Sequence, residues 1–179
     1  ADVAPYLTAS VGELVQEELF YEDFAGGLTA WTVVDGGTGS GPAQTWTTDN
    51  PGGQTTIPLT DPFAIVDSDE HGSGQTMDEQ LISPIIDATG YVAVELQFSH
   101  DFNWYQGGDD EQADVDVRSS LTGGVWTNVV NFSGGDVSGT EVVDITAYAA
   151  GASDLQVRFY YYDASYEWWW AVDDIYKEL

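Results

Sequence analysis

Apolar and polar residues alternate along short stretches of the chain from Leu19 onward, with the period of two that marks a β-strand. The alternation is cleanest in the segments 91–100 and 155–162. Their apolar positions are Val92, Val94, Leu96 and Phe98 in the first, and Leu155, Val157, Phe159 and Tyr161 in the second. Strands with one apolar and one polar face suit two antiparallel sheets packed face to face. The pattern therefore predicts an all-β sandwich.

Glycine-rich and Asp-rich turns divide this region into short expected strands. The segments are Leu19–Phe24, Trp31–Val34, Gln44–Thr47, Phe63–Val66, Gln80–Ile86, Tyr91–His100, Ala113–Ser119, Val125–Phe132, Thr140–Ile145, Leu155–Tyr162 and Trp168–Tyr176. No stretch repeats its neighbour at a fixed period, which argues against a solenoid or a propeller. We predict one sandwich domain over residues 19–179, preceded by a separate segment, 1–18.

Two interpretations of residues 1–18 remain open. Ser10 and Glu13 have the spacing of a helix capping box, and apolar residues follow at helical intervals, although Gly12 weakens a helix. Residues 3–9 instead suit an extended arm that pairs at a sheet edge, because Pro5 is tolerated there. The segment is a short helix or an arm.

The charge of the chain is extreme. Among its 179 residues, 31 Asp and Glu face three Lys and Arg, for a net charge of −28. Such a surface repels nucleic acid and acidic glycans, does not adhere to anionic lipid, and attracts divalent cations. A hydrophobic content of 42% nevertheless argues for a folded chain. Since no apolar run approaches the ~20 residues that span a bilayer, we expect no membrane insertion.

The environment we expect is extracellular. The sequence begins Ala-Asp-Val without an initiator Met, which suits a secreted chain whose signal peptide has been removed and equally suits a chain shortened at its N-terminus. It has no cysteine, so neither a disulfide framework nor thiolate chemistry is available. Two of the three cations, Arg118 and Arg158, fall on expected strands beside acidic residues. We predict that each pairs with carboxylates, because a guanidinium binds them bidentately.

An acidic loop between two expected strands has nearly the spacing of a twelve-residue calcium loop. Polar groups fall at positions 1, 3, 5, 7, 9 and 12, and Gly72 is at position 6; the six are Asp67, Asp69, His71, Ser73, Gln75 and Asp78. His71 replaces the usual Asp or Asn, and Asp78 is shorter than a bidentate Glu. We predict calcium binding by Asp67, Asp69, His71 and Asp78, with an acidic surface turn as the alternative.

Five short motifs, in order, resemble the MAM-like jelly-roll modules of extracellular proteins, including cleaved-adhesin and choice-of-anchor domains. They are Phe20-Tyr21-Glu22-Asp23-Phe24, Asp78-Glu79-Gln80-Leu81-Ile82-Ser83-Pro84, Leu96-Gln97-Phe98-Ser99-His100, Gly123-Gly124 with Trp126, and Ala171-Val172-Asp173-Asp174-Ile175. The resemblance covers about residues 19–176. It implies a calcium-stabilised jelly-roll sandwich of two antiparallel sheets that serves adhesion or recognition. The chain departs from such proteins in having no cysteine, and we expect neither a catalytic domain nor an anchor in it.

The resemblance also implies a second metal site. Glu22 or Asp23 from the first strand would meet Asp173 or Asp174 from the last, and a hard cation would relieve the repulsion between them. The alternative is that one residue of each pair is solvated.

Catalysis finds little support in the sequence. Only two histidines are present, with no Gly-x-Ser-x-Gly motif and no thiol for a zinc site. Acids are so frequent that a carboxylate pair for glycoside hydrolysis carries little weight. We therefore expect a chain that is not an enzyme, with a glycoside-active jelly roll as the weakest alternative.

Aromatic residues are the candidates for ligand binding, because flat exposed rings stack on sugars or fill a partner's pocket. Trp104 and Tyr105 fall in an expected loop, and Tyr162 and Tyr166 fall on the face or turn opposite an apolar stripe. Trp168 and Trp170 are expected in the core.

Two functions compete at this point. In the first, the chain is a surface or matrix subunit that self-associates, with residues 1–18 adding to a neighbour's sheet and a filament as the result. In the second, it is a carbohydrate-binding or adhesion module of a larger secreted enzyme, with a neutral glycan or a cell-surface protein as its partner.

Overall fold

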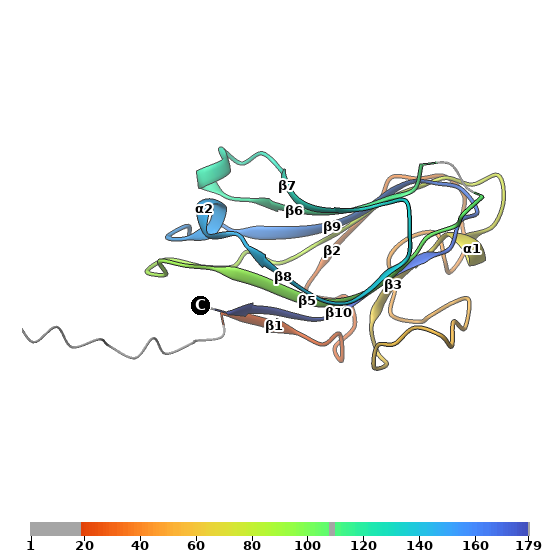
Figure 1. The fold of residues 1–179 in the computed structure, drawn as a ribbon, viewed down its shortest axis with the longest axis horizontal. Helices are drawn as coiled ribbons and strands as arrows, with labels where there is room; N and C mark the ends of the chain where they lie inside the picture. The colour runs from red at the N-terminus through yellow and green to blue at the C-terminus, as the bar shows by residue number, and fades with distance from the viewer. Residues whose placement is uncertain (1–18, 108–109, 179) are drawn as a thin grey trace, which may run out of the picture.

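The predicted two-sheet architecture is what the structure shows. The structure is a computed structural model that describes residues 19–107 and 110–178. Two sheets of five strands each face one another, and every pairing between their strands is antiparallel (Figure 1). This arrangement confirms the all-β jelly-roll sandwich.

Sheet A contains the first and last strands, in the order β1-β10-β5-β8, with β3 also paired to β10. Its strands are β1 (Phe20–Glu22), β3 (Ala64–Asp67), β5 (Glu95–Asn103), β8 (Val137–Asp144) and β10 (Trp169–Glu178). Sheet B has the order β2-β4-β9-β6-β7. Its strands are β2 (Thr32–Asp35), β4 (Met77–Ile82), β6 (Gln112–Arg118), β7 (Thr127–Phe132) and β9 (Gln156–Ala164).

Three short helical turns lie at the ends of the sandwich: α1 (Ser68–His71), η1 (Ser120–Thr122) and α2 (Thr146–Ala149). The sequence pattern does not predict them, because three or four residues are too few for a helical period to show. None of the helices in the described part of the chain is long and apolar enough to cross a membrane.

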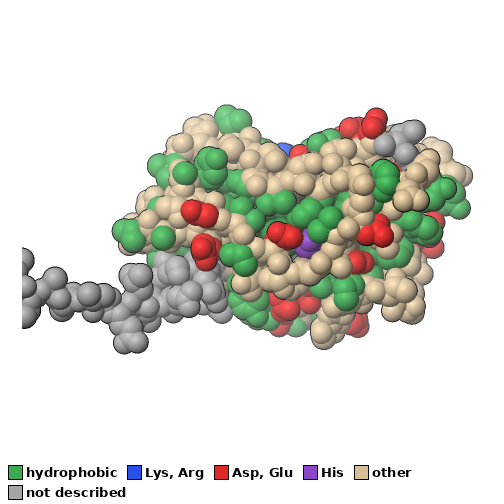
Figure 2. Space-filling view, in the orientation of Figure 1, with side chains coloured by type: hydrophobic (Ala, Val, Ile, Leu, Met, Phe, Trp, Pro, Cys, Tyr) green, Lys and Arg blue, Asp and Glu red, His purple; other side chains and the backbone are tan. Residues whose placement is uncertain are grey.

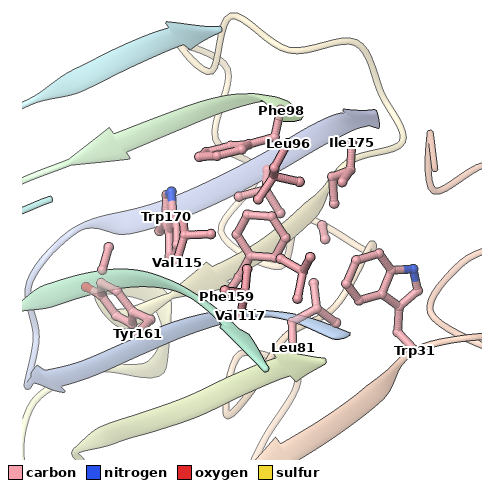
Figure 3. Packing of buried hydrophobic residues seen from close by; sticks show 14 of the residues in the cluster. Trp31, Leu81, Leu96, Phe98, Val115, Val117, Phe159, Tyr161, Trp170 and Ile175 are labelled. Atoms are coloured by element: carbon pink, nitrogen blue, oxygen red, sulfur yellow. The ribbon is translucent and has the colours of Figure 1, made fainter. Parts of the chain in front are cut away.

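The core lies between the two sheets and is rich in aromatic rings (Figure 3). Trp170 of β10 is fully buried, and its ring lies 5.7 Å from that of Phe159 on β9 and 5.6 Å from that of Trp46. Phe98 of β5 meets the Phe159 ring edge to face at 5.3 Å. Because these residues occupy alternate positions of their strands, the predicted apolar faces of 91–100 and 155–162 form the centre of the core, except at the start of the first segment.

Strand boundaries differ from the prediction in several places, of which three stand out. The segment 91–94 is irregular, and Val92 is 84% exposed although its pattern placed it with the core. Its backbone is used in turn contacts: the Tyr91 amide donates to the Ala88 carbonyl, and the Val94 amide donates to Thr146 Oγ1. The expected strand 44–47 is reduced to one bridge between Thr47 and Ile65. The strand expected at 80–86 covers 77–82.

The outer surface carries the excess acid. Figure 2 shows Asp and Glu side chains scattered over the face in view, whereas Lys or Arg atoms are visible only in a small area at its upper edge. The predictions for residues 1–18, whether helix or arm, fall outside the described residues.

Candidate functional site

The outward side of sheet B is lined by polar and aromatic residues. Along β9, the side chains at 157, 159 and 161 are buried while those at 156, 158, 160 and 162 are partly exposed. The facing positions of β4, β6 and β7 continue this surface. We call it the polar face; it comprises Asp78, Gln80, Gln112, Asp114, Asp116, Arg118, Trp126, Asn128, Asn131, Gln156, Arg158, Tyr160 and Tyr162.

A row of flat side chains runs along this face. The rings of Tyr160 and Tyr162 are stacked, with centroids 4.5 Å apart and an interplanar angle of 22°. The guanidinium of Arg158 lies 4.6 Å from the centre of the Tyr160 ring and 4.7 Å from that of Trp126. Arg118 contacts the Trp126 ring as well, at 4.4 Å. Cation–π contacts of this kind hold the row in one geometry.

Arg158 is fixed at the middle of the row by three acceptor contacts. Its Nε and Nη2 donate to Asp116 Oδ2 at 2.9 and 2.6 Å, and its Nη1 donates to Gln80 Oε1 at 2.9 Å. Asp116 is only 3% exposed and also accepts from Asn128. The prediction that Arg158 pairs with a carboxylate is therefore confirmed.

Each stacked tyrosine donates its hydroxyl to an aspartate. Tyr160 donates to Asp78 Oδ1 at 2.6 Å, and Tyr162 donates to Asp114 Oδ2 at 3.1 Å. Burial and the facing carboxylate raise the pKa of both phenols, that of Tyr162 to about 12. The rings therefore stay neutral, and their orientation is set before any ligand arrives.

The tyrosine end of the row opens into a depression of about 580 Å³. Its lining includes Tyr160, Tyr162 and Asp78 from the polar face, together with Thr76 and Ser165. Aromatic rings flanked by fixed oxygen and amide groups can bind a molecule that has both apolar faces and hydroxyl groups.

The four predicted ligand-binding aromatics are divided between two places. Tyr162 lies on the polar face, whereas Trp104, Tyr105 and Tyr166 lie among loops at one end of the sandwich. Tyr105 is 42% exposed and contacts the edge of the Trp168 ring, with centroids 5.9 Å apart. Two depressions, of about 190 and 380 Å³, adjoin these loops. We call this second region the loop end.

A buried carboxyl, Glu111, supports the loop end. It accepts from the Tyr105 amide at 2.6 Å and from the Tyr161 hydroxyl at 2.7 Å. Burial outweighs these hydrogen bonds and, with Glu167 and Asp136 nearby, raises the pKa of Glu111 to about 7. The loop at Tyr105 therefore rests on a group that titrates near neutrality.

Glutamine at position 111 should make the protein less sensitive to pH. Because the folded-state pKa of Glu111 is raised, its ionisation costs stability as pH rises from about 4.5 to about 7. Relative to Glu111→Gln, the wild type should lose about 1–2 kcal/mol of unfolding free energy between pH 5 and pH 8, after allowance for solvent screening. Urea unfolding at both pH values measures this difference. A difference that does not change with pH would contradict the assignment.

The acidic loop does not gather its residues into one site. Asp67 caps α1, accepting from the Glu70 amide at 3.0 Å and from Gln54 Nε2 at 3.1 Å. The His71 ring contacts the Thr38 carbonyl, and Asp78 lies on β4 with Tyr160. Among the described residues no group of three or more acidic or histidine side chains is arranged to hold a metal ion. Calcium binding by Asp67, Asp69, His71 and Asp78 stays a prediction.

The structure does bring Glu22 and Asp173 close together. Glu22 lies at the end of β1 opposite Ile175, next to the irregularity in β10 that follows Asp173. Asp173 is 3% exposed, and its Oδ1 has no hydrogen-bond partner. Burial raises the pKa of Asp173 to about 6, with further contributions from Asp174, Asp23 and Glu22.

Two features of the polar face were missed or wrongly predicted from the sequence. Trp126 was not a candidate, because it precedes a strand and no local pattern places it over Arg118 and Arg158. Arg118 was expected to pair with a carboxylate, but it donates to the Gln156 amide oxygen. The nearby Asp116 is already used by Arg158.

Comparison with known proteins identifies the fold. No protein-family model matches the sequence. The search of curated proteins also finds no match. Among solved structures, the K3 cleaved adhesin domain of the Lys-gingipain of Porphyromonas gingivalis W83 is similar, with a TM-score of 0.65 and 18% identity over 91% of this chain and 98% of that one. The K1 domain of the same protein gives 0.60 and 17%, over 88% and 96%.

A third similar structure is TmCBM61 in complex with β-1,4-galactotriose, with a TM-score of 0.55 and 14% identity over 87% of this chain and 93% of that one. At these identities the comparisons establish the shared fold. They confirm the cleaved-adhesin type of jelly roll that the five sequence motifs implied.

Proposed function

We propose that this chain is a secreted, non-catalytic recognition module that binds a glycan on the polar face of sheet B. The observation that carries this proposal is the stacked pair of Tyr160 and Tyr162, continued by Arg158 and Trp126 along one row. Sugar rings present C–H faces that stack on aromatic rings and hydroxyls that hydrogen-bond to amides and carboxylates. The polar face offers both.

Preorganisation of the row favours binding over a purely structural role. The tyrosine hydroxyls are held by Asp78 and Asp114, and Arg158 is held by Asp116 and Gln80. A ligand that binds there immobilises few side chains, so little of the interaction energy is lost to ordering. The fold shared with a module whose structure holds a galactotriose is further support.

The charge of the chain bears on which glycan binds. With a net charge of −28, the surface repels a chain that carries an acid on every sugar. The module therefore suits a glycan with a largely neutral backbone.

Alanine at both Tyr160 and Tyr162 should weaken glycan binding by about ten- to a hundredfold, because two stacked rings are lost. Isothermal titration with neutral oligosaccharides of β-1,4-linked galactose, glucose and mannose measures the affinity. The matched control is Tyr21→Ala, which removes a ring on sheet A that packs against Tyr176. If the control weakens binding as much as the double variant, or if no oligosaccharide binds, the proposal fails.

Calcium stabilisation is a second part of the proposal, and we place it at Glu22 and Asp173. The unpartnered, buried Oδ1 of Asp173 is a hard oxygen donor of the kind that calcium prefers. Both oxygens of Glu22 accept hydrogen bonds, from the Phe24 amide and from Trp31 Nε1, and each keeps a further lone pair. A bound cation would supply the positive partner that the Asp173 carboxylate lacks.

Calcium should raise the melting temperature of the wild type, since it binds the native state, and chelation should reverse the rise. Asp173→Asn should abolish that response. Without calcium the variant should be more stable at pH 7 by about 1 kcal/mol, because the raised pKa of Asp173 makes the wild type lose stability as pH rises from about 4 to about 6. Asp67→Asn is the control, as it alters the acidic loop instead. If calcium still raised the melting temperature of Asp173→Asn but no longer raised that of Asp67→Asn, the ion would be assigned to the acidic loop.

Self-association through residues 1–18 stays a prediction, since these residues lie outside the described part of the chain. Size-exclusion chromatography of the full chain in millimolar calcium, and then in chelator, tests it. A monomer under both conditions would remove a calcium-dependent filament from consideration.

A further inference from the structure

Arg118 stands apart from the other described arginine in having no acidic partner. Among the residues the structure describes, no carboxylate oxygen lies within 4.0 Å of its guanidinium. In a chain with 31 Asp and Glu and only three Lys and Arg, such an arginine is exceptional. Its positive charge is left uncompensated by its immediate neighbours.

A neutral group holds Arg118 in place. Its Nε and Nη2 donate to the same oxygen, Gln156 Oε1, at 3.1 and 2.8 Å. The amide nitrogen of Gln156 donates in turn to the Ser83 carbonyl at 2.8 Å, which fixes the direction of the oxygen. The Trp126 ring packs against the guanidinium at 4.4 Å. Arg118 is therefore oriented without being neutralised.

One edge of the guanidinium remains for a ligand. Gln156 occupies the Nε–Nη2 edge, so both N–H groups of Nη1 and the second of Nη2 have no acceptor among the described residues. Arg118 is partly exposed, so a ligand can reach it from solvent. Two parallel N–H groups on one planar edge match the two oxygens of a carboxylate.

We propose that Arg118 binds the carboxylate of an acidic sugar within the glycan that occupies the polar face. This inference rests on the proposed function and names one chemical group of the ligand. A sugar acid fits better than a free anion because Arg118 shares the Trp126 ring with Arg158, whose guanidinium leads on to Tyr160 and Tyr162.

The length of the row indicates an oligosaccharide with its acid at one end. Arg118 pairs in register with Gln156, and β9 rises roughly 20 Å from Gln156 to Tyr162. The tyrosine end of the row is acidic, with Asp78 and Asp114 receiving the two hydroxyls. The ligand therefore has neutral sugars at the tyrosines and its carboxylate at Arg118, which gives the bound chain one direction.

A matched pair of probes tests this inference. The first probe is the neutral oligosaccharide that binds best in the titrations of the polar face. The second is the same molecule with one terminal hydroxymethyl group oxidised to a carboxylate. The wild type should prefer the acidic probe by about tenfold or more, as expected for charge-assisted hydrogen bonds. In Arg118→Gln the ratio of the two affinities should fall to about one. Arg118→Lys should keep only part of it, because an ammonium lacks the planar fork.

The control is Lys177→Gln, which removes the same charge from sheet A and should keep the wild-type ratio. A wild type that binds both probes equally would overturn the role of Arg118 and leave glycan binding intact. Failure of both probes to bind would refute the proposed function itself. Retention of the preference in Arg118→Gln would also overturn the inference. The inference would also be overturned if a short peptide with a free terminal carboxylate displaced the acidic probe as well as the unlabelled acidic oligosaccharide does, because the partner would then be a protein.

Discussion

Replacing Trp170 by alanine is expected to lower the unfolding free energy by about 3–5 kcal/mol, the largest effect of any single change proposed for this chain. Trp170 is completely buried at the centre of the sandwich, where its ring contacts those of Trp46, Phe132 and Phe159. These partners come from a loop and from two strands of the facing sheet B, so they cannot all move to fill the space. The cost is therefore the lost burial plus an unfilled cavity.

Urea unfolding followed by tryptophan fluorescence and circular dichroism measures the loss for Trp170→Ala. Trp168→Ala is the matched control, because Trp168 is only partly buried and packs beside the smaller cluster of Phe63, Ile65, Trp169 and Ala171. It should cost clearly less. Equal losses in the two variants would show that the sandwich does not depend on the contacts of Trp170.

Arg158→Gln is expected to destabilise the protein by about 2–4 kcal/mol, because it leaves the Asp116 carboxylate buried without its charge partner. The side chains of Arg158 and Asp116 are 14% and 4% exposed, so the pair is screened far less than a surface ion pair. The same change removes the guanidinium that joins the Tyr160 and Trp126 rings. Glycan affinity should fall together with stability.

Lys177→Gln, which removes one positive charge near the end of β10, should change the unfolding free energy by about 0.5 kcal/mol or less. The comparison separates a specific pair from a general loss of positive charge in an acidic protein. Equal losses for Arg158→Gln and Lys177→Gln would contradict a special role for the Asp116 pair. The double variant Arg158→Gln/Asp116→Asn should recover part of the loss, since it also removes the unpaired charge.

The sandwich could be predicted from the sequence because its strands carry the core on alternate positions. Val157, Phe159 and Tyr161 are all buried, as the alternation in their segment predicts. The same rule failed at Val92, where a turn and a side-chain contact from Thr146 take the backbone out of the sheet. The alternation of apolar and polar residues predicts which side chains share a face of a strand. It does not predict at which residue the strand begins to hydrogen-bond to its neighbour.

The candidate site was predictable only in part, because it is built across strands far apart in the sequence. Tyr162 was found as an outward aromatic on a strand. Its neighbours on the face depend on the register of β9 with β4 and β6, which brings Asp78 and Asp114 to the two tyrosines. Asp78 was assigned to a calcium loop, since its spacing from Asp67 was visible and its pairing with β9 was not.

Unlike the neighbours on the polar face, Glu22 and Asp173 were expected to lie near one another before the structure was known. Its convergence was implied by the resemblance of the chain ends to jelly-roll modules, in which the first and last strands lie side by side. The structure pairs β1 with β10 and places the two residues together. Knowledge of the topology thus predicted that the first and last strands pair, although they are more than a hundred positions apart, while a metal site between them stays a prediction.

Mapping a bound oligosaccharide by NMR tests the central claim most directly. Backbone amide shifts of the labelled full chain would be followed during titration with the neutral oligosaccharide that binds best. Glycan binding on the polar face predicts that the largest changes fall on 158–162 of β9 and on the facing residues of β4 and β6. Changes confined to the loop end, around Trp104, Tyr105 and Trp168, would contradict the account and move the binding site there.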